Sequence, residues 1–279
     1  MKQRVISAVV ALAFLGVVLF WVDTVFLNIV IALLGAIAVY EVLRAAKCTE
    51  PKAMMILCVA AALAIPFLGY DTNFIMLPVA AFVFALGMML ILLVKFETLR
   101  VEKVGFAAFI TIMIPVTLSI FVHFRNKYQG DGTEIFYILL IFVGAFITDT
   151  GAYLGGRAFG KRKLAPKISP NKTVEGAISG AILCIIVLPL YCWIYSFISA
   201  NAGIPVMVNY VGMICIAPVL AVMAMAGDLS ASIIKRQCGV KDFGSIMPGH
   251  GGVMDRFDSV LFVAPTLLIY AHYLPLISV

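Results

Sequence analysis

Two acidic residues in a short polar segment, "PGHGGVMDRFDS" (residues 248–259), raise the question of chemistry in this chain. Asp255 and Asp258 are three positions apart at the predicted start of an apolar helix, so their carboxylates are expected on one helix face. Carboxylates bind Mg²⁺, which also accepts the phosphate groups of substrates. We therefore predict Asp255 as a direct Mg²⁺ ligand, with Asp258 and Asp228 as co-ligands or water-mediated supports and Asp149 as a weaker candidate.

Glycines in the same segment indicate that its backbone comes close to another group. Gly249, Gly251 and Gly252 can adopt positive φ or admit a ligand where a side chain would block it. His250 lies among them, and Arg256 stands between the two aspartates. An aspartate near a helix N-terminus is also favourable for electrostatic reasons alone, but that explanation leaves the glycines and the histidine unexplained.

A second polar stretch, "GDLSASIIKRQCGVKD" (residues 227–242), follows an apolar segment. If the apolar helix continues into it, one face offers a metal ligand, a hydroxyl and two cations for phosphates. That face consists of Asp228, Ser232, Lys235 and Arg236. Gly239 is placed to end the helix, and Lys241 follows it. The alternative is a solvated helix end that binds nothing.

Asp149 lies inside an apolar segment, "ITDTGAYLGGRAFG" (residues 147–160). A carboxylate in a membrane helix costs a few kcal/mol, about 3 at the bilayer centre, so it normally faces protein or a watered cavity. This favours a functional role over a hydrogen-bond anchor between helices. Glycines four residues apart, which pack helices closely in membranes, predict two packing faces: Gly151 with Gly155, and Gly176 with Gly180.

The segment "ISPNKTVEG" (residues 168–176) predicts a helix start. Ser169 suits the N-cap and Pro170 the first helical position. Lys172 is then expected in the first turn, where a cation beside unpaired backbone N–H groups would bind a phosphate. The alternative is ordinary capping next to a lysine that only sets topology.

Composition indicates the framework that must position these residues. Of 279 residues, 63% are hydrophobic and 12% charged, too few polar groups to cover a soluble domain. The apolar runs are continuous, which predicts an all-α polytopic integral membrane protein with about nine transmembrane helices rather than a barrel. The predicted helices cover 5–22, 25–40, 53–69, 74–94, 104–122, 135–155, 176–198, 210–227 and 258–275.

We expect one continuous membrane domain, with N-terminal helices in residues 1–104 and the site in residues 105–279. The six cysteines are scattered without a CxxC pair, which favours packing over metal or disulfide roles. With the N-terminus in the cytoplasm, all but Arg125 and Lys127 of the 20 Lys and Arg residues fall on the cytoplasmic side. The active site is therefore expected at the cytoplasmic face. Cations that only set topology and attract anionic lipids are the alternative.

These residues resemble the bacterial phosphatidate cytidylyltransferases, also called CDP-diglyceride synthases. The resemblance covers roughly residues 145–176 and 227–259, and its signature residues here are Ser232, Lys235, Arg236, Lys241, Asp242, Pro248, His250, Gly251, Gly252, Asp255, Arg256 and Asp258. Met247 stands where the family pattern has another apolar residue. The resemblance implies that CTP and phosphatidate give CDP-diacylglycerol and pyrophosphate, with Mg²⁺, at the cytoplasmic face of a bacterial inner membrane.

We assign residues to roles on this basis. Catalytic roles are expected for Asp228, Lys235, Arg236, Lys241, His250, Asp255, Arg256 and Asp258, and phosphate binding for Ser169, Lys172, Ser232, Gly251 and Gly252. The phosphate monoester of phosphatidate has a second pKa near ~6, so it is already a nucleophile and needs no strong base. Positioning and charge stabilisation should supply most of the catalysis.

Two other functions stay open at this point. A CTP-dependent lipid kinase would phosphorylate a lipid alcohol, with His250 or an aspartate as base. A transporter of an anionic solute would use Asp149 and the basic loops, but no inverted repeat is visible and the charges gather at one face. No nucleic-acid partner is expected, and the sequence leaves a homodimer open.

Overall fold

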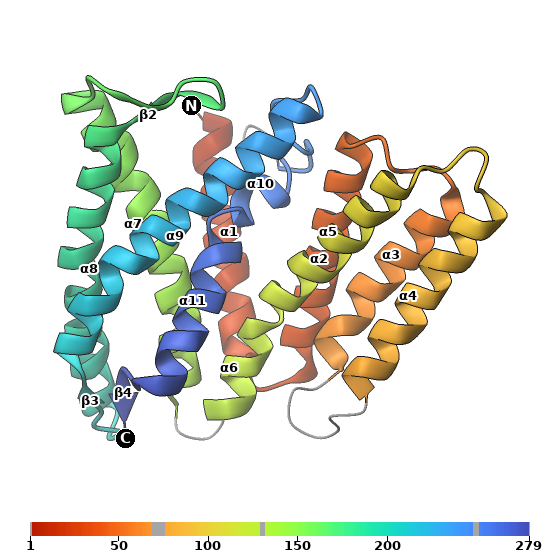
Figure 1. The fold of residues 1–279 in the computed structure, drawn as a ribbon. Coiled ribbons are helices and arrows are strands. Elements are labelled where there is room, and N and C mark those ends of the chain that lie inside the picture. The colour runs from red at the N-terminus through yellow and green to blue at the C-terminus, as the bar shows by residue number, and fades with distance from the viewer. Residues whose placement is uncertain (1, 69–75, 129–131, 248–250, 279) are drawn as a thin grey trace. The chain divides into compact units, whose positions relative to one another are not determined.

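The structure is a computed structural model that describes residues 2–68, 76–128, 132–247 and 251–278, with side chains from residue 9 onward (Figure 1). Helices dominate it. Their bounds are α1 Lys2–Phe20, α2 Val25–Ala45, α3 Lys52–Ala64 followed by the 3₁₀ helix η1 Ile65–Phe67, α4 Met76–Val94, α5 Val101–Leu118, α6 Ile120–Tyr128, α7 Glu134–Phe159, α8 Val174–Asn201, α9 Tyr210–Gln237, α10 Met254–Phe257 and α11 Val260–Tyr273.

Within the described residues, each predicted apolar segment is mainly helical, although the segment predicted at 104–122 is divided between α5 and α6. Among the described residues, six helical stretches are long and apolar enough to cross a membrane: Val25–Ala45, Met76–Val94, Val101–Tyr128, Glu134–Phe159, Val174–Asn201 and Tyr210–Gln237. Three shorter apolar helices are Val9–Phe20, Lys52–Phe67 and Val260–Tyr273. The structure thus supports a helical membrane protein, whereas the count of nine spans stays a prediction.

In the part of the chain that the structure describes, two short antiparallel strand pairs add to the expected all-α architecture. β1 (Lys163–Ala165) pairs with β2 (Ser169–Thr173), and β3 (Met207–Val208) pairs with β4 (Ile277–Ser278). β2 runs directly into α8, whereas β3 follows the other end of that helix, so the two pairs lie at opposite ends of α8 (Figure 1). These pairs are too short to alter the helical fold class.

The chain forms two compact units. Unit 1 comprises Met1–His123 and Gln237–Arg256, and unit 2 comprises Phe124–Arg236 and Phe257–Val279. Each unit combines two separate stretches of the sequence, so residues far apart in the chain meet within it. The predicted boundary after residue 104 stays a prediction.

Unit 2 contains α7 and α8, which lie side by side and pack through glycine faces (Figure 1). A Cβ atom on Gly151 would lie 3.0 Å from the Cα atom of Gly180, and one on Gly180 would lie 2.7 Å from the carbonyl oxygen of Thr148. A Cβ atom on Gly155 would run into Ser179, and one on Gly176 would lie 2.6 Å from a backbone oxygen of α7. The predicted glycine packing faces are therefore confirmed.

Helices α4 and α8 show how much apolar surface the fold leaves outside its core. Only 11% of the apolar stretch of α4 and 17% of the apolar stretch of α8 are buried within the protein. Residues such as Phe82, Val83, Ile182 and Ile186 are more than half exposed. Apolar surface on this scale is not stable in water, so lipid is the environment that fits it.

Candidate active site

A cluster of carboxylates and ammonium groups gathers in unit 2, around the C-terminal half of α9. We call it the aspartate cluster; it comprises Asp149, Lys172, Asp228, Lys235 and Asp258. Asp149 comes from α7, Lys172 from β2, Asp228 and Lys235 from α9, and Asp258 from the turn before α11.

Helix α9 supplies the first part of this cluster because it continues past its apolar stretch to Gln237. Ser232 donates its hydroxyl to Asp228 Oδ1 (3.4 Å) one turn away, and Lys235 lies in the last turn. Gly239 follows the helix with φ +71°, a conformation that glycine adopts readily. The predicted continuation of the helix, its polar face and its glycine stop are confirmed.

Lys172 joins the cluster through β2, and not through a helix start. Its Nζ atom is buried and lies 2.5 Å from Asp228 Oδ2, although the two side chains are 23% and 29% exposed. The described residues offer this nitrogen no hydrogen-bond acceptor beyond that ion pair. An ammonium group has three N–H donors, so Lys172 is suited to take a further anion such as a phosphate.

The predicted N-cap at Ser169 is wrong. Ser169 pairs with Ala165 in the β1–β2 hairpin, and the helix begins after Thr173, whose side chain accepts the N–H of Gly176 (3.1 Å). A threonine cap serves the same purpose, and the hairpin takes up the four residues before it. Lys172 therefore precedes the helix and does not occupy its first turn.

The hairpin is held in place by charged side chains of the two adjacent helices. Glu175 of α8 accepts the backbone N–H groups of Lys161 and Arg162, each 3.0 Å from Oε2. Arg236 of α9 donates from Nε to the carbonyl oxygen of Ile168 (3.1 Å). In this structure Arg236 therefore fixes the segment that carries Lys172, and its predicted phosphate contact stays a prediction.

The pKa of Asp258 shows how burial and neighbouring charges act in the aspartate cluster. Burial, followed by the negative charge of Asp228, raises the pKa of Asp258 to about 7, and Asp149 adds to this. Lys235 and the Ser259 N–H, which donates to Asp258 Oδ1 (2.8 Å), act in the opposite direction. The cluster thus has an excess of negative charge that a cation would relieve.

Close backbone approach brings Asp258 to α9. A Cβ atom on Gly227 would run into the carbonyl oxygen of Asp258, so glycine is needed directly before Asp228. Ser259 in turn donates its hydroxyl to Asp149 Oδ2 (2.9 Å). Sequence reasoning missed Gly227 and Ser259, although both lie next to predicted aspartates. The Ser259 contact also gives Asp149 a structural role beside its candidate metal role.

The glycine-rich segment of unit 1, which we define as residues 241–247 and 251–256, carries further predicted residues. Asp255 is 8% exposed, and its Oδ2 accepts the backbone N–H groups of Phe243 (2.9 Å) and Gly252 (3.0 Å). Gly251 has φ +87°, which confirms the predicted positive φ. Lys241 and Arg256 are exposed. Pro248, Gly249 and His250 lie outside the described residues, so the role of His250 stays a prediction.

The prediction that Asp255 and Asp258 share one helix face is wrong. Asp255 belongs to the four-residue helix α10, and Asp258 lies in a turn between α10 and α11. Helix α10 ends at Phe257, before Asp258. Asp255 Oδ2 accepts backbone N–H groups of its own segment. The metal-ligand role of Asp255 stays a prediction, and a change at this residue would also disturb the backbone that it holds.

Mg²⁺ can be tested against the residues present. Among the described residues, no three Asp, Glu, His or Cys side chains gather closely enough to hold a metal ion by themselves. However, Mg²⁺ is usually held by one or two carboxylates together with water and substrate phosphates. Asp228 and Asp258 supply two carboxylates, and the charge of Asp228 adds to burial in raising the pKa of Asp258. The donor set therefore fits this ion.

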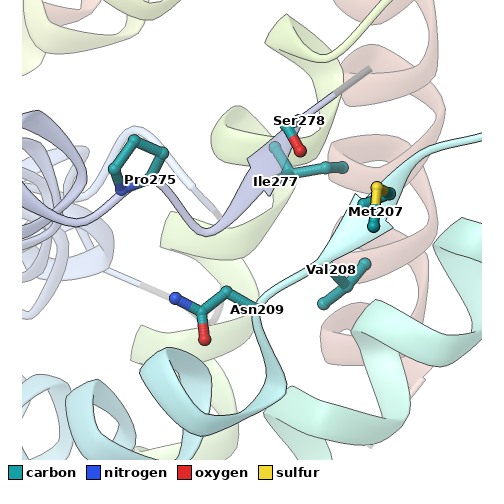
Figure 2. Close-up of a pocket in the computed structure, with 6 residues that line it drawn as sticks. All are labelled: Met207, Val208, Asn209, Pro275, Ile277 and Ser278. Atoms are coloured by element: carbon teal, nitrogen blue, oxygen red, sulfur yellow. The ribbon is translucent and has the colours of Figure 1, made fainter.

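A small pocket lies elsewhere in unit 2, beside the β3–β4 pair (Figure 2). It is lined by Met207, Val208, Asn209, Pro275, Ile277 and Ser278. It follows the C-terminal end of α8, whereas Lys172 lies just before the N-terminal end of that helix. With no charged lining residue, it does not offer the groups that phosphate chemistry requires.

Comparison with known proteins agrees with the chemistry of these residues. A model of the cytidylyltransferase family matches residues 2–274. A phosphatidate cytidylyltransferase of Bacillus subtilis (strain 168) is 36% identical over 273 residues, which is 96% of this chain and 96% of the relative. Phosphatidate cytidylyltransferases of Staphylococcus saprophyticus and Staphylococcus aureus (strain COL) are 44% and 43% identical over 144 residues, 52% of each chain. The chain therefore belongs to the cytidylyltransferase family.

Proposed function

We propose that this chain is a phosphatidate cytidylyltransferase, which transfers CMP from CTP to phosphatidate and forms CDP-diacylglycerol and pyrophosphate. The observation that carries the proposal is a relative of that name that is 36% identical over 96% of the chain. The aspartate cluster supports it, because carboxylates beside lysines are what a reaction between two phosphate compounds requires. Apolar helices around the cluster suit a lipid substrate.

The reaction needs little acid–base help from the protein. A phosphate oxygen of phosphatidate attacks the α-phosphorus of CTP, and the bond from that phosphorus to the bridging oxygen of the β-phosphate breaks. Pyrophosphate leaves with the electron pair of that bond. Because phosphatidate is largely a dianion above its second pKa of ~6, no residue has to remove a proton. The main obstacle is the repulsion between two anions.

Lys172 and Lys235 are placed to reduce this repulsion. Lys172 Nζ is buried and pairs with Asp228, so a substrate phosphate can take over part of its hydrogen bonding. Lys235 acts electrostatically on Asp258 in the same cluster. Their charges fix the phosphates near the carboxylates before reaction, which is the positioning that lowers the barrier.

Asp228 and Asp258 would hold Mg²⁺, with Asp149 and Asp255 as further candidates. The bound ion would neutralise the charge of the phosphates and of the departing pyrophosphate. Among these residues we change Asp258, because its described hydrogen bond is to the N–H of the next residue, Ser259, whereas Asp255 and Asp149 bind more distant parts of the chain. We also place the aspartate cluster at the cytoplasmic face of a bacterial inner membrane, on the distribution of Lys and Arg.

The activity is tested with the purified chain in mixed micelles containing CTP, phosphatidate and Mg²⁺. We expect release of pyrophosphate and formation of a lipid that carries CMP, in equal amounts. Release of CDP with phosphorylation of a lipid alcohol would support a lipid kinase in its place. Absence of turnover, together with flux of an anionic solute into vesicles, would support transport.

Replacing one carboxylate tests the aspartate cluster. Asp258→Asn removes a charge at nearly constant volume, and we expect turnover to fall about 10²-fold or more, as for other key electrostatic groups. The Mg²⁺ concentration that gives half-maximal turnover should rise. Asp23→Asn changes an exposed aspartate and should leave both quantities unchanged. Normal turnover of Asp258→Asn, with an unaltered Mg²⁺ requirement, would exclude Asp258 from the metal site.

Orientation is tested with single cysteines at the two ends of α8. Lys167 in the hairpin and Asn201 at the end of α8 are both exposed. In a variant without the six native cysteines, Lys167→Cys should react with a membrane-impermeant thiol reagent only in inverted vesicles. Asn201→Cys should react in intact cells whose outer envelope admits the reagent. The reverse pattern would place the aspartate cluster on the outer side.

A further inference from the structure

A buried acidic residue outside the recognised motif contacts the glycine-rich segment in unit 1. Glu41 lies in α2, inside a stretch that is apolar enough to span a membrane, and only 3% of it is exposed. Its Oε2 accepts the backbone N–H of Met254 (3.0 Å), 213 residues further along the chain. An acidic residue at such a place is costly unless it has a function or a fixed partner.

The shape of the glycine-rich segment is fitted to this carboxyl group. A Cβ atom on Gly252 would lie 2.5 Å from both Glu41 oxygens, and one on Gly244 would run into Oε1. Glu41 thus occupies the space that a side chain at either position would need, and such a side chain would force Glu41 to move. At Gly252 the close approach expected from the sequence is made to Glu41.

The segment is thus held by two carboxyl groups. Asp255 holds it from within, through the N–H groups of Phe243 and Gly252. Glu41 holds it from α2, through the N–H of Met254, the residue directly before Asp255. Because neighbouring backbone groups are bound by the two side chains, the backbone from Gly252 to Asp255 has little freedom to shift.

We propose that Glu41 is a positioning residue: it fixes the glycine-rich segment so that the motif residues on it, Gly251, Gly252, Asp255 and Arg256, are held in their working geometry. Glu41 does so through backbone contacts and does not itself touch substrate. The inference rests on the proposed cytidylyltransferase activity, because that activity gives the segment its role. A shift of about 1 Å in a group that positions substrate can lower turnover about 10²-fold.

Three variants of α2 separate positioning from general stability. Glu41→Ala removes the contact with Met254, and Glu41→Gln keeps one oxygen that can accept the same N–H. Asn28→Ala is the control, because Asn28 is also buried in α2 and also donates to a distant backbone group, the carbonyl oxygen of Pro66 (2.7 Å). Both alanine variants should unfold at lower temperature than the unaltered chain.

Of the two alanine variants, only Glu41→Ala should slow catalysis. We expect its kcat to fall between about 10-fold and 10²-fold, with a smaller loss in Glu41→Gln and an unchanged kcat in Asn28→Ala. Hydrogen exchange of the peptide that contains Met254 should become faster in Glu41→Ala and not in Asn28→Ala. If Glu41→Ala keeps full kcat, or keeps normal exchange at Met254, the positioning role is overturned.

A second comparison uses the glycine contact. Gly252→Ala should impair turnover, and this loss should be smaller in the Glu41→Ala background, because the group that its Cβ meets has been removed. Gly251→Ala, whose Cβ would face Asp255 at φ +87°, should cost the same in both backgrounds. Equal losses for Gly252→Ala in both backgrounds would also overturn the proposal. An inactive unaltered chain would refute the proposed function, whereas the exchange measurement would still test Glu41.

Discussion

Carboxylates in an apolar framework are the constraint on which the rest of this structure depends. A buried carboxylate needs a positive charge, a hydrogen-bond donor or a proton. In unit 2, Asp228 has the ammonium group of Lys172, Asp149 has the hydroxyl of Ser259, and Asp258 has a pKa raised to about 7. Asp258 also accepts the N–H of Ser259, yet burial and the nearby Asp228 keep its pKa raised.

Much of the local architecture of unit 2 follows from bringing these groups together. Lys172 reaches Asp228 because the β1–β2 hairpin returns the chain to α8 and α9, and Glu175 and Arg236 fix that hairpin. Gly227 admits the backbone of Asp258. Some charged side chains thus hold backbone, and we propose that others bind phosphates and a cation.

In the contacts that we describe in unit 1, carboxyl groups serve only to hold backbone. Glu41 and Asp255 bind backbone N–H groups of one short segment. This accounts for glycines that, from the sequence, could equally have made room for a ligand. A motif rich in glycine and aspartate can therefore mark a backbone that is held in place as well as a surface that binds substrate.

The sequence predicted features that depend on local patterns. The apolar segments, the polar face of α9, the stop at Gly239 and the glycine faces of α7 and α8 are all set by residues close in the chain. Features that depend on how neighbouring segments pair or bend were not predicted from these patterns. The hairpin pairing displaced the expected N-cap at Ser169, and the break after α10 separated Asp255 from Asp258.

Glu41 shows this limit most clearly. The predicted second helix ended at residue 40, because a glutamate reads as the end of an apolar stretch, whereas α2 continues to Ala45. The partner of Glu41 is 213 residues away, so no local pattern marks it. The N–H groups that stabilise an acidic side chain inside a helix are known only once the fold is known.

The most direct test of the account is the binding of Mn²⁺, as a spectroscopic substitute for Mg²⁺, measured by electron paramagnetic resonance on the purified chain. If Asp228 and Asp258 hold the ion, Asp258→Asn should weaken binding by about 10-fold or more, within the range seen when groups around a metal are removed. Lys172→Gln should strengthen binding, because it removes the ammonium group that competes for Asp228. Unchanged Mn²⁺ affinity in both variants would contradict the account.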